Sequence, residues 1–137
     1  MKGAYTLAST ITIQDKSTIS GPGYFWELPV ATEKLTVREM IKIRVFEEVT
    51  DYNAQQPDLY RGLVQPTEAE QTLNGYKMLK RREIDWDEQY ESAVQAFQQN
   101  GFLILVNDQQ VTELDDVIEI LPETSVTFLK LVPLVGG

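Results

Sequence analysis

The sequence predicts an α+β fold made of two strands, a helix, a helical insertion and three further strands, in that order. Three observations lead to this prediction. Runs in which apolar and polar residues alternate, as they do in half-buried strands, lie near both ends of the chain. Helix-capping patterns precede apolar residues at helical spacing. The 137 residues, of which 42% are hydrophobic, can supply one core, so residues 1–137 are expected to form a single domain.

Two strands are predicted at the amino-terminal end. In the first, apolar residues alternate with polar ones at Tyr5, Leu7, Ile11 and Ile13. The second covers residues 24–30 and follows the turn signal Gly21-Pro22-Gly23. We expect these strands to pair with each other, joined by a loop that begins at Gln14 and is longer than a tight hairpin.

The first helix has the clearest local signal. Thr36 and Glu39 form the S/T-x-x-E capping box, in which the two residues satisfy each other's backbone amides. Val37, Ile41 and Val45 follow at helical spacing and share one face. We therefore expect a helix that begins here and lays its apolar face on the sheet.

The segment after this helix, residues 57–100, is interpreted as a helical insertion. A short helical turn is expected to open near Gln65 and to close at Asn74-Gly75. A second helix is predicted to begin after the capping residue Asp85 and to stop at Asn100-Gly101.

Three strands are predicted after the insertion. Residues 102–106 are continuously apolar, which is typical of a central strand that is covered on both faces. Asn107-Asp108 can turn the chain into a short return strand over residues 109–113. Residues 114–120 are expected to form a connecting turn, and residues 124–132 the last strand.

Composition excludes most kinds of active site. The chain has no cysteine and no histidine, so thiolate nucleophiles, imidazole bases and Cys/His metal sites are excluded. No spacing assembles a nucleophile with a base, and a glycine-rich phosphate loop is absent. We therefore expect that the protein is not an enzyme and has no catalytic residues, no metal site and no cofactor of its own.

Charge and hydropathy limit the partners and the location. The net charge of −9 argues against nucleic acid and anionic membranes as partners, because both require a basic surface. The first residues lack the apolar segment of a signal peptide, and no later run approaches the length of a membrane span. A cytoplasmic protein is expected.

The chain ends in two glycines, Gly136 and Gly137, directly after the last predicted strand. With glycine at about 7% of residues, a diglycine end arises by chance in roughly 0.5% of chains. Pro133 has no backbone amide hydrogen, so it should end strand pairing and leave residues 133–137 as an exposed tail. This pattern indicates that the terminal carboxylate is the functional group.

The last third of the chain carries a family resemblance. Residues 104–111 resemble the strand-turn-strand that bears the binding patch of ubiquitin, and residues 114–118 resemble the connector that follows it. Val126-Thr127-Phe128, then Pro133, then Gly136-Gly137 look like the ending of the small sulfur carriers. The chain thus resembles the bacterial ubiquitin-like proteins of the β-grasp superfamily.

This resemblance implies a ubiquitin-like β-grasp fold, in which a mixed sheet of about five strands packs on a helix. The resemblance covers residues 4–52 and 102–137. The helical insertion at residues 57–100 would precede the third strand of the sheet and has no counterpart in ubiquitin. Some bacterial ubiquitin-like proteins are similarly larger.

The resemblance also implies a role for the carboxylate of Gly137. In such families an adenylating activating enzyme joins the terminal glycine to AMP, so that enzyme, and not this chain, binds ATP. Glycine has no Cβ, so Gly136 would keep the end of the tail slim enough for a narrow channel. Pro133, Leu134 and Val135 would dock the tail on the enzyme.

The functional hypotheses differ in what happens to the carboxylate of Gly137. A protein modifier would pass from the activating enzyme to a conjugating enzyme and then to an amine of a target protein, from which a deconjugating protease could release it. The length of the chain and its insertion favour such a modifier. The apolar tail is closer to a sulfur carrier, which would form a thiocarboxylate at Gly137. The second alternative is a β-grasp interaction or assembly subunit whose tail is never activated.

Three leucines are candidates for a partner surface. Leu105 stands at the position that resembles the central residue of the ubiquitin binding patch, with core packing as its alternative role. Leu129 and Leu131 share the second apolar face of the last strand. Either the insertion covers this face, or the face contacts a partner protein or a second copy of the chain.

Overall fold

The computed structural model describes residues 9–17, 24–30, 32–72 and 74–131. The chain divides into two compact units, one of residues 1–39 and 100–137 and the other of residues 40–99. The described residues form a mixed five-stranded sheet, a pair of two-stranded sheets and two helices. The predicted α+β class is therefore confirmed, and so is a mixed sheet of five strands.

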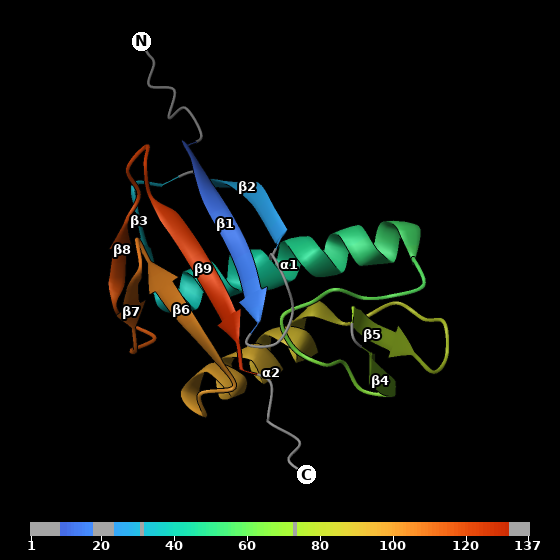
Figure 1. Cartoon of the computed structure of the whole chain (residues 1–137). Helices are drawn as coiled ribbons and strands as arrows, with labels where there is room; N and C mark the ends of the chain where they lie inside the picture. The colour runs from blue at the N-terminus through green and yellow to red at the C-terminus, as the bar shows by residue number, and fades with distance from the viewer. Residues whose placement is uncertain (1–8, 18–23, 31, 73, 132–137) are drawn as a thin grey trace. The chain divides into compact units, whose positions relative to one another are not determined.

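The five-stranded sheet contains strands from both the amino-terminal and the carboxy-terminal parts of the chain (Figure 1). Its strands, in spatial order, are β2 (Tyr24–Val30), β1 (Ser9–Ser17), β9 (Ser125–Lys130), β6 (Phe102–Val106) and β7 (Gln109–Val111). β1 and β9 run parallel, whereas the other neighbouring strands are antiparallel. The last strand of the chain is therefore the middle strand of the sheet.

Strand β1 extends further than the sequence predicted. Ile11 and Ile13 are fully buried, in agreement with the predicted alternation, while Tyr5 and Leu7 lie outside the described residues. Residues 14–17 were expected to open a loop but continue the strand and pair with β9. The prediction was wrong there because it relied on apolar alternation, which this polar segment lacks. Backbone pairing with β9 keeps the segment in the strand.

The hairpin of β6 and β7 agrees with its prediction. Asn107 and Asp108 form its turn with φ of 49° and 69°, the left-handed angles of a two-residue type I′ connection. Asparagine and aspartate tolerate these angles better than most residues. The side-chain oxygen of Asn107 also accepts a hydrogen bond from the Ser125 amide at 3.0 Å, which ties this turn to the start of β9.

A second, two-stranded sheet pairs β3 (Lys34–Thr36) with β8 (Val117–Glu119) in antiparallel register. Leu35 lies opposite Ile118, and both side chains are buried. The expected connecting turn at residues 114–120 is therefore partly a strand. Each strand has three residues, and its partner is far away in sequence, so local periodicity could not reveal the pair.

Helix α1 (Val37–Gln55) begins at the predicted capping box. The Thr36 amide donates to a carboxylate oxygen of Glu39 at 2.9 Å, and the Glu39 amide donates to the Thr36 hydroxyl at 3.1 Å. The amide of Val37 donates to the Asp116 carbonyl at 2.9 Å, so the first turn is also tied to the segment before β8.

Replacing Thr36 with alanine should lower the free energy of unfolding by about 1 kcal/mol, because the Glu39 amide loses its acceptor. Thermal or denaturant unfolding of T36A measures the change. A matched control is Thr32→Ala, since Thr32 is exposed and caps no helix. Equal stability of T36A and T32A would contradict a capping role for Thr36.

The second unit contains most of α1, the strands β4 (Ala69–Thr72) and β5 (Gly75–Met78), and helix α2 (Trp86–Gln98). β4 and β5 form an antiparallel hairpin where a short helical turn was expected. Gly75 does not end a helix but is the first residue of β5, opposite Thr72, and its φ of +152° is an angle that disfavours side chains. The insertion is thus partly β-structure.

Helix α2 agrees with its predicted limits. A carboxylate oxygen of Asp85 accepts a hydrogen bond from the Asp87 amide at 3.0 Å, as expected of a capping residue. Asn100, with φ of 60°, follows the end of the helix in the left-handed conformation common at that position.

Candidate functional site

The predicted activation site lies outside the described residues. This applies to Gly136 and Gly137 and to the predicted docking residues Pro133, Leu134 and Val135. The structure does define the strand that precedes them, because β9 ends at Lys130 and Leu131 follows it. The chain therefore enters the diglycine segment directly from the middle strand of the sheet.

Strand β9 is held on both edges. It pairs in parallel with β1 over residues 125–130 and antiparallel with β6 over residues 126–130 (Figure 1). The Leu131 amide continues the second pairing with a hydrogen bond to the Gly101 carbonyl at 3.4 Å. Strand pairing on two sides fixes the position of this strand up to residue 131.

The two faces of the sheet differ in burial. Side chains alternate between the faces of a strand, and directly paired residues of neighbouring strands share a face. One face is closely packed and carries fully buried side chains, among them Ile11, Ile13, Ile104, Val126 and Phe128. On the opposite face Thr127 is buried, whereas its neighbours on β6 and β9 are only half-buried.

That opposite face carries a leucine cluster, which we call the leucine face. Leu103 of β6 lies directly opposite Leu129 of β9, and Leu105 lies opposite Thr127. By alternation Leu131 belongs to the same side as Leu129. Leu103, Leu105 and Leu129 are half-buried, and Leu131 is 37% exposed. The structure therefore brings together the three leucines that the sequence singled out and adds Leu103.

Polar and aromatic side chains flank the leucine face on the side of β1 and β2. Lys16 of β1, which is exposed, pairs with Leu129. Gln14 of β1 pairs with Thr127 on one side and with Phe25 of β2 on the other. Phe25 is 65% exposed. An apolar centre with a cation and an exposed ring at its border is common among protein-binding surfaces.

Sequence reasoning missed Leu103 and Phe25. Leu103 could have been found, because it stands two residues before Leu105 and therefore shares its face in any strand. The place of Phe25 beside the leucine face could not have been predicted, because it depends on the register of β1 and β2, which the sequence did not define.

A buried charged cluster lies in the second unit and was also not predicted. Glu48 accepts three hydrogen bonds, from Arg44 Nε at 3.1 Å, the Tyr60 hydroxyl at 3.0 Å and the Leu63 amide at 3.0 Å. The side chains of Arg44 and Glu48 are 1% and 12% exposed. Burial and then the nearby Glu48 carboxylate raise the pKa of Tyr60, so its hydroxyl stays a donor. These mutual contacts make the cluster structural.

The described residues contain no group of three acidic, cysteine or histidine side chains that could hold a metal ion. In the same part of the chain, neither helix is long and apolar enough to cross a membrane. No protein-family model matches the sequence, and no curated protein matches it either.

Proposed function

We propose that this protein is a ubiquitin-like modifier with a β-grasp core, whose Gly137 carboxylate is adenylated by an activating enzyme and then conjugated to target proteins. One observation carries the proposal most: the middle strand of the mixed sheet leads directly into the apolar segment that ends in Gly136-Gly137. Under this proposal the chain is a substrate of the activating enzyme, and that enzyme binds the ATP.

The strand arrangement supports the β-grasp assignment. The first and last strands, β1 and β9, pair in parallel at the centre, and each also has an antiparallel neighbour, β2 or β6. Helix α1 follows β2 in the chain, separated from it by the short strand β3. This order of elements is what a β-grasp domain requires, with the hairpin β4–β5 and helix α2 as additions before β6.

From this chain, the proposed chemistry involves only the Gly137 carboxylate, which reacts with the ATP bound to the activating enzyme. A carboxylate oxygen of Gly137 attacks the α-phosphorus of ATP, an oxygen–phosphorus bond forms, and pyrophosphate leaves. A thiol attacks the acyl carbon and AMP leaves, which gives a thioester. A target amine then attacks the same carbon, an isopeptide bond forms, and the thiol leaves. Glycine at the last two positions leaves the acyl carbon open to these attacks.

Activation can be tested by incubating the protein with ATP and the activating enzymes of its source cell. Intact mass measurement should find an AMP adduct, and fragmentation should locate the adduct on Gly137. A thiocarboxylate at Gly137 in protein isolated from cells would instead favour the sulfur carrier. The apolar sequence of the tail is the observation that favours this alternative. Unmodified protein in both experiments would favour an assembly subunit.

The leucine face is the proposed docking surface for the activating or conjugating enzyme. Its four leucines cross the boundary between β6 and β9, and β9 leads to the segment that the enzyme must reach. Apolar contacts near the centre of an interface commonly contribute most of the binding free energy. A charge on this face should therefore weaken activation without touching the reacting carboxylate.

Leu129→Asp should slow adenylation about tenfold or more at limiting enzyme, because a buried carboxylate is placed in an apolar contact. Steady-state rates of AMP-adduct formation measure the effect. A matched control is V117D, because Val117 is 59% exposed on β8 and lies outside the leucine face. L131D serves as a second variant if Leu129→Asp is poorly folded. Equal rates for L131D, V117D and the unaltered protein would contradict docking through this face.

A further inference from the structure

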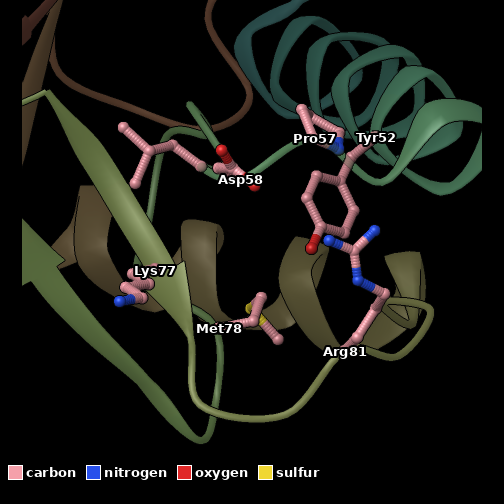
Figure 2. A pocket seen from close by; sticks show the side chains of 7 residues that line it. Tyr52, Pro57, Asp58, Lys77, Met78 and Arg81 are labelled. Atoms are coloured by element: carbon pink, nitrogen blue, oxygen red, sulfur yellow. The ribbon is translucent and has the colours of Figure 1, made fainter.

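The second unit contains a pocket of about 440 Å³ near the end of α1 (Figure 2). All the residues that line this pocket belong to residues 40–99, so the pocket lies within that one unit. Its volume falls within the range of pockets that hold small ligands. None of the lining side chains takes part in the proposed activation chemistry.

The hydroxyl of Tyr52 gives the first indication of a ligand. Tyr52 is only 5% exposed, and its hydroxyl makes no hydrogen bond with any residue that the structure describes. Its ring packs edge-on against the ring of Tyr60, with the two ring centres 5.4 Å apart, so the side chain is held in place. Buried polar groups in proteins nearly always have a hydrogen-bond partner. A molecule bound in the pocket would supply the missing partner.

The guanidinium of Arg81 lies beside this hydroxyl. Figure 2 shows the Tyr52 hydroxyl turned toward it. One guanidinium nitrogen donates to the Gln56 carbonyl at 3.0 Å, which leaves further N–H groups for a ligand. The phenol and the guanidinium can therefore donate to the same acceptor, and a carboxylate is the acceptor that best matches an arginine fork.

A carboxylate on the same pocket wall favours a positive group. Asp58 is exposed, and it makes neither a hydrogen bond nor an ion pair with the described residues, Arg81 included. Asp58 comes shortly after Gln55, the last residue of α1, and the last turn of that helix has no basic residue. The negative end of the helix dipole and the Asp58 carboxylate both attract a cation. The pocket thus has separate places for a negative and a positive group.

The rest of the lining is apolar apart from one cation. Pro57, Leu59 and Met78 form an apolar wall, of which Leu59 and Met78 are half-buried. Lys77 is exposed and forms no ion pair within the described part of the chain. A ligand that fits this lining carries a carboxylate, a cation and an apolar group.

We propose that this pocket binds a free α-amino acid with an apolar side chain. The carboxylate of the amino acid accepts hydrogen bonds from Arg81 and from the Tyr52 hydroxyl. Its ammonium group lies at Asp58, and its side chain contacts the apolar wall. A phosphate ester would bring a second negative charge toward Asp58, and a fatty acid would leave Asp58 without a counter-charge. The proposal does not depend on the activation of Gly137.

Isothermal titration calorimetry of the full-length protein with L-leucine tests the proposal. Three analogues each remove one group: leucinamide lacks the carboxylate, isocaproate lacks the ammonium group, and glycine lacks the apolar side chain. We expect each analogue to bind about tenfold or more weakly than leucine. All these comparisons use the same folded protein.

Variants identify the residues that bind leucine. R81A should weaken leucine binding about tenfold or more, and Tyr52→Phe, which keeps the ring, about threefold. K80A is the matched control, because Lys80 is an exposed cation next to Arg81 that does not line the pocket.

Three results would overturn the proposal: no heat of binding with leucine, equal binding of leucine and leucinamide, or equal binding to R81A and K80A. Equal binding of isocaproate would overturn the amino acid as the ligand and leave a simple carboxylate. Tighter binding of a tripeptide that ends in leucine would overturn the free amino acid in favour of a peptide end.

Discussion

Replacing Glu48 with alanine is expected to lower the free energy of unfolding by about 3–5 kcal/mol. The substitution removes the acceptor of three hydrogen bonds at once and leaves the guanidinium of Arg44, 1% exposed, without its buried counter-charge. The Tyr60 hydroxyl and the Leu63 amide lose the same acceptor. An uncompensated buried charge costs more than the net gain of the original ion pair, so the loss should exceed that of an ordinary surface substitution.

Denaturant unfolding of E48A measures this change, and E47A is its matched control. Glu47 is the preceding residue of α1, and burial together with the charge of Asp51 raises the pKa of its carboxyl, so its ionised form is mildly unfavourable. Removal of Glu47 should therefore leave stability nearly unchanged. A loss below about 1 kcal/mol in E48A would contradict a structural role for the cluster.

Deleting Gly136 and Gly137 is expected to reduce adenylation at least about 100-fold, since misplacing a reacting group by even 1 Å can cost that much. The new terminal carboxylate, on Val135, would stop about 7 Å short of the reacting position if the segment is extended. Its branched side chain would also crowd the acyl carbon. Rates of AMP-adduct formation with the same activating enzyme measure the effect.

The double variant G136A and G137A is the control for length, because it restores the reach of the chain and adds only two Cβ atoms. Its rate should lie between those of the deletion and the unaltered protein. The unfolding midpoint should be unchanged in both variants. Adenylation that persists at its full rate after the deletion would show that another carboxylate is activated.

The sequence predicted those elements whose signals are local. The capping box of Thr36 and Glu39 identified the start of α1, Asp85 that of α2, and Asn107-Asp108 the turn between β6 and β7. Each of these signals consists of residues that contact one another within a few positions in the chain. Local hydrogen bonds and backbone angles were therefore sufficient to define these boundaries.

Elements that depend on distant partners were not predicted. β3 and β8 have three residues each, so the buried pair Leu35 and Ile118 forms only when distant segments meet. The hairpin of β4 and β5 was missed because Asn74-Gly75 was interpreted as a helix end, whereas Gly75 is the first residue of β5 and pairs with Thr72.

The candidate site shows the same division. Alternation within β9 indicated that Leu129 and Leu131 share a face, and alternation within β6 could have added Leu103 to Leu105. Only the register of β6 and β9 placed the two pairs on one side of the sheet. The pocket around Tyr52 and Arg81 combines residues from α1 and from the segment after β5. Sequence spacing could not place these two side chains on the same wall.

The central claim is that Gly137 becomes joined to target proteins, and trypsin digestion of proteins from the source cell tests it most directly. Trypsin cuts after Lys130, so a modified lysine would carry residues 131–137 as a branch through an isopeptide bond to Gly137. We expect mass spectrometry to find such branched peptides, and to lose them when Gly136 and Gly137 are deleted. If residues 131–137 are found only as a linear peptide, with a free carboxylate or a thiocarboxylate, the modifier function is contradicted.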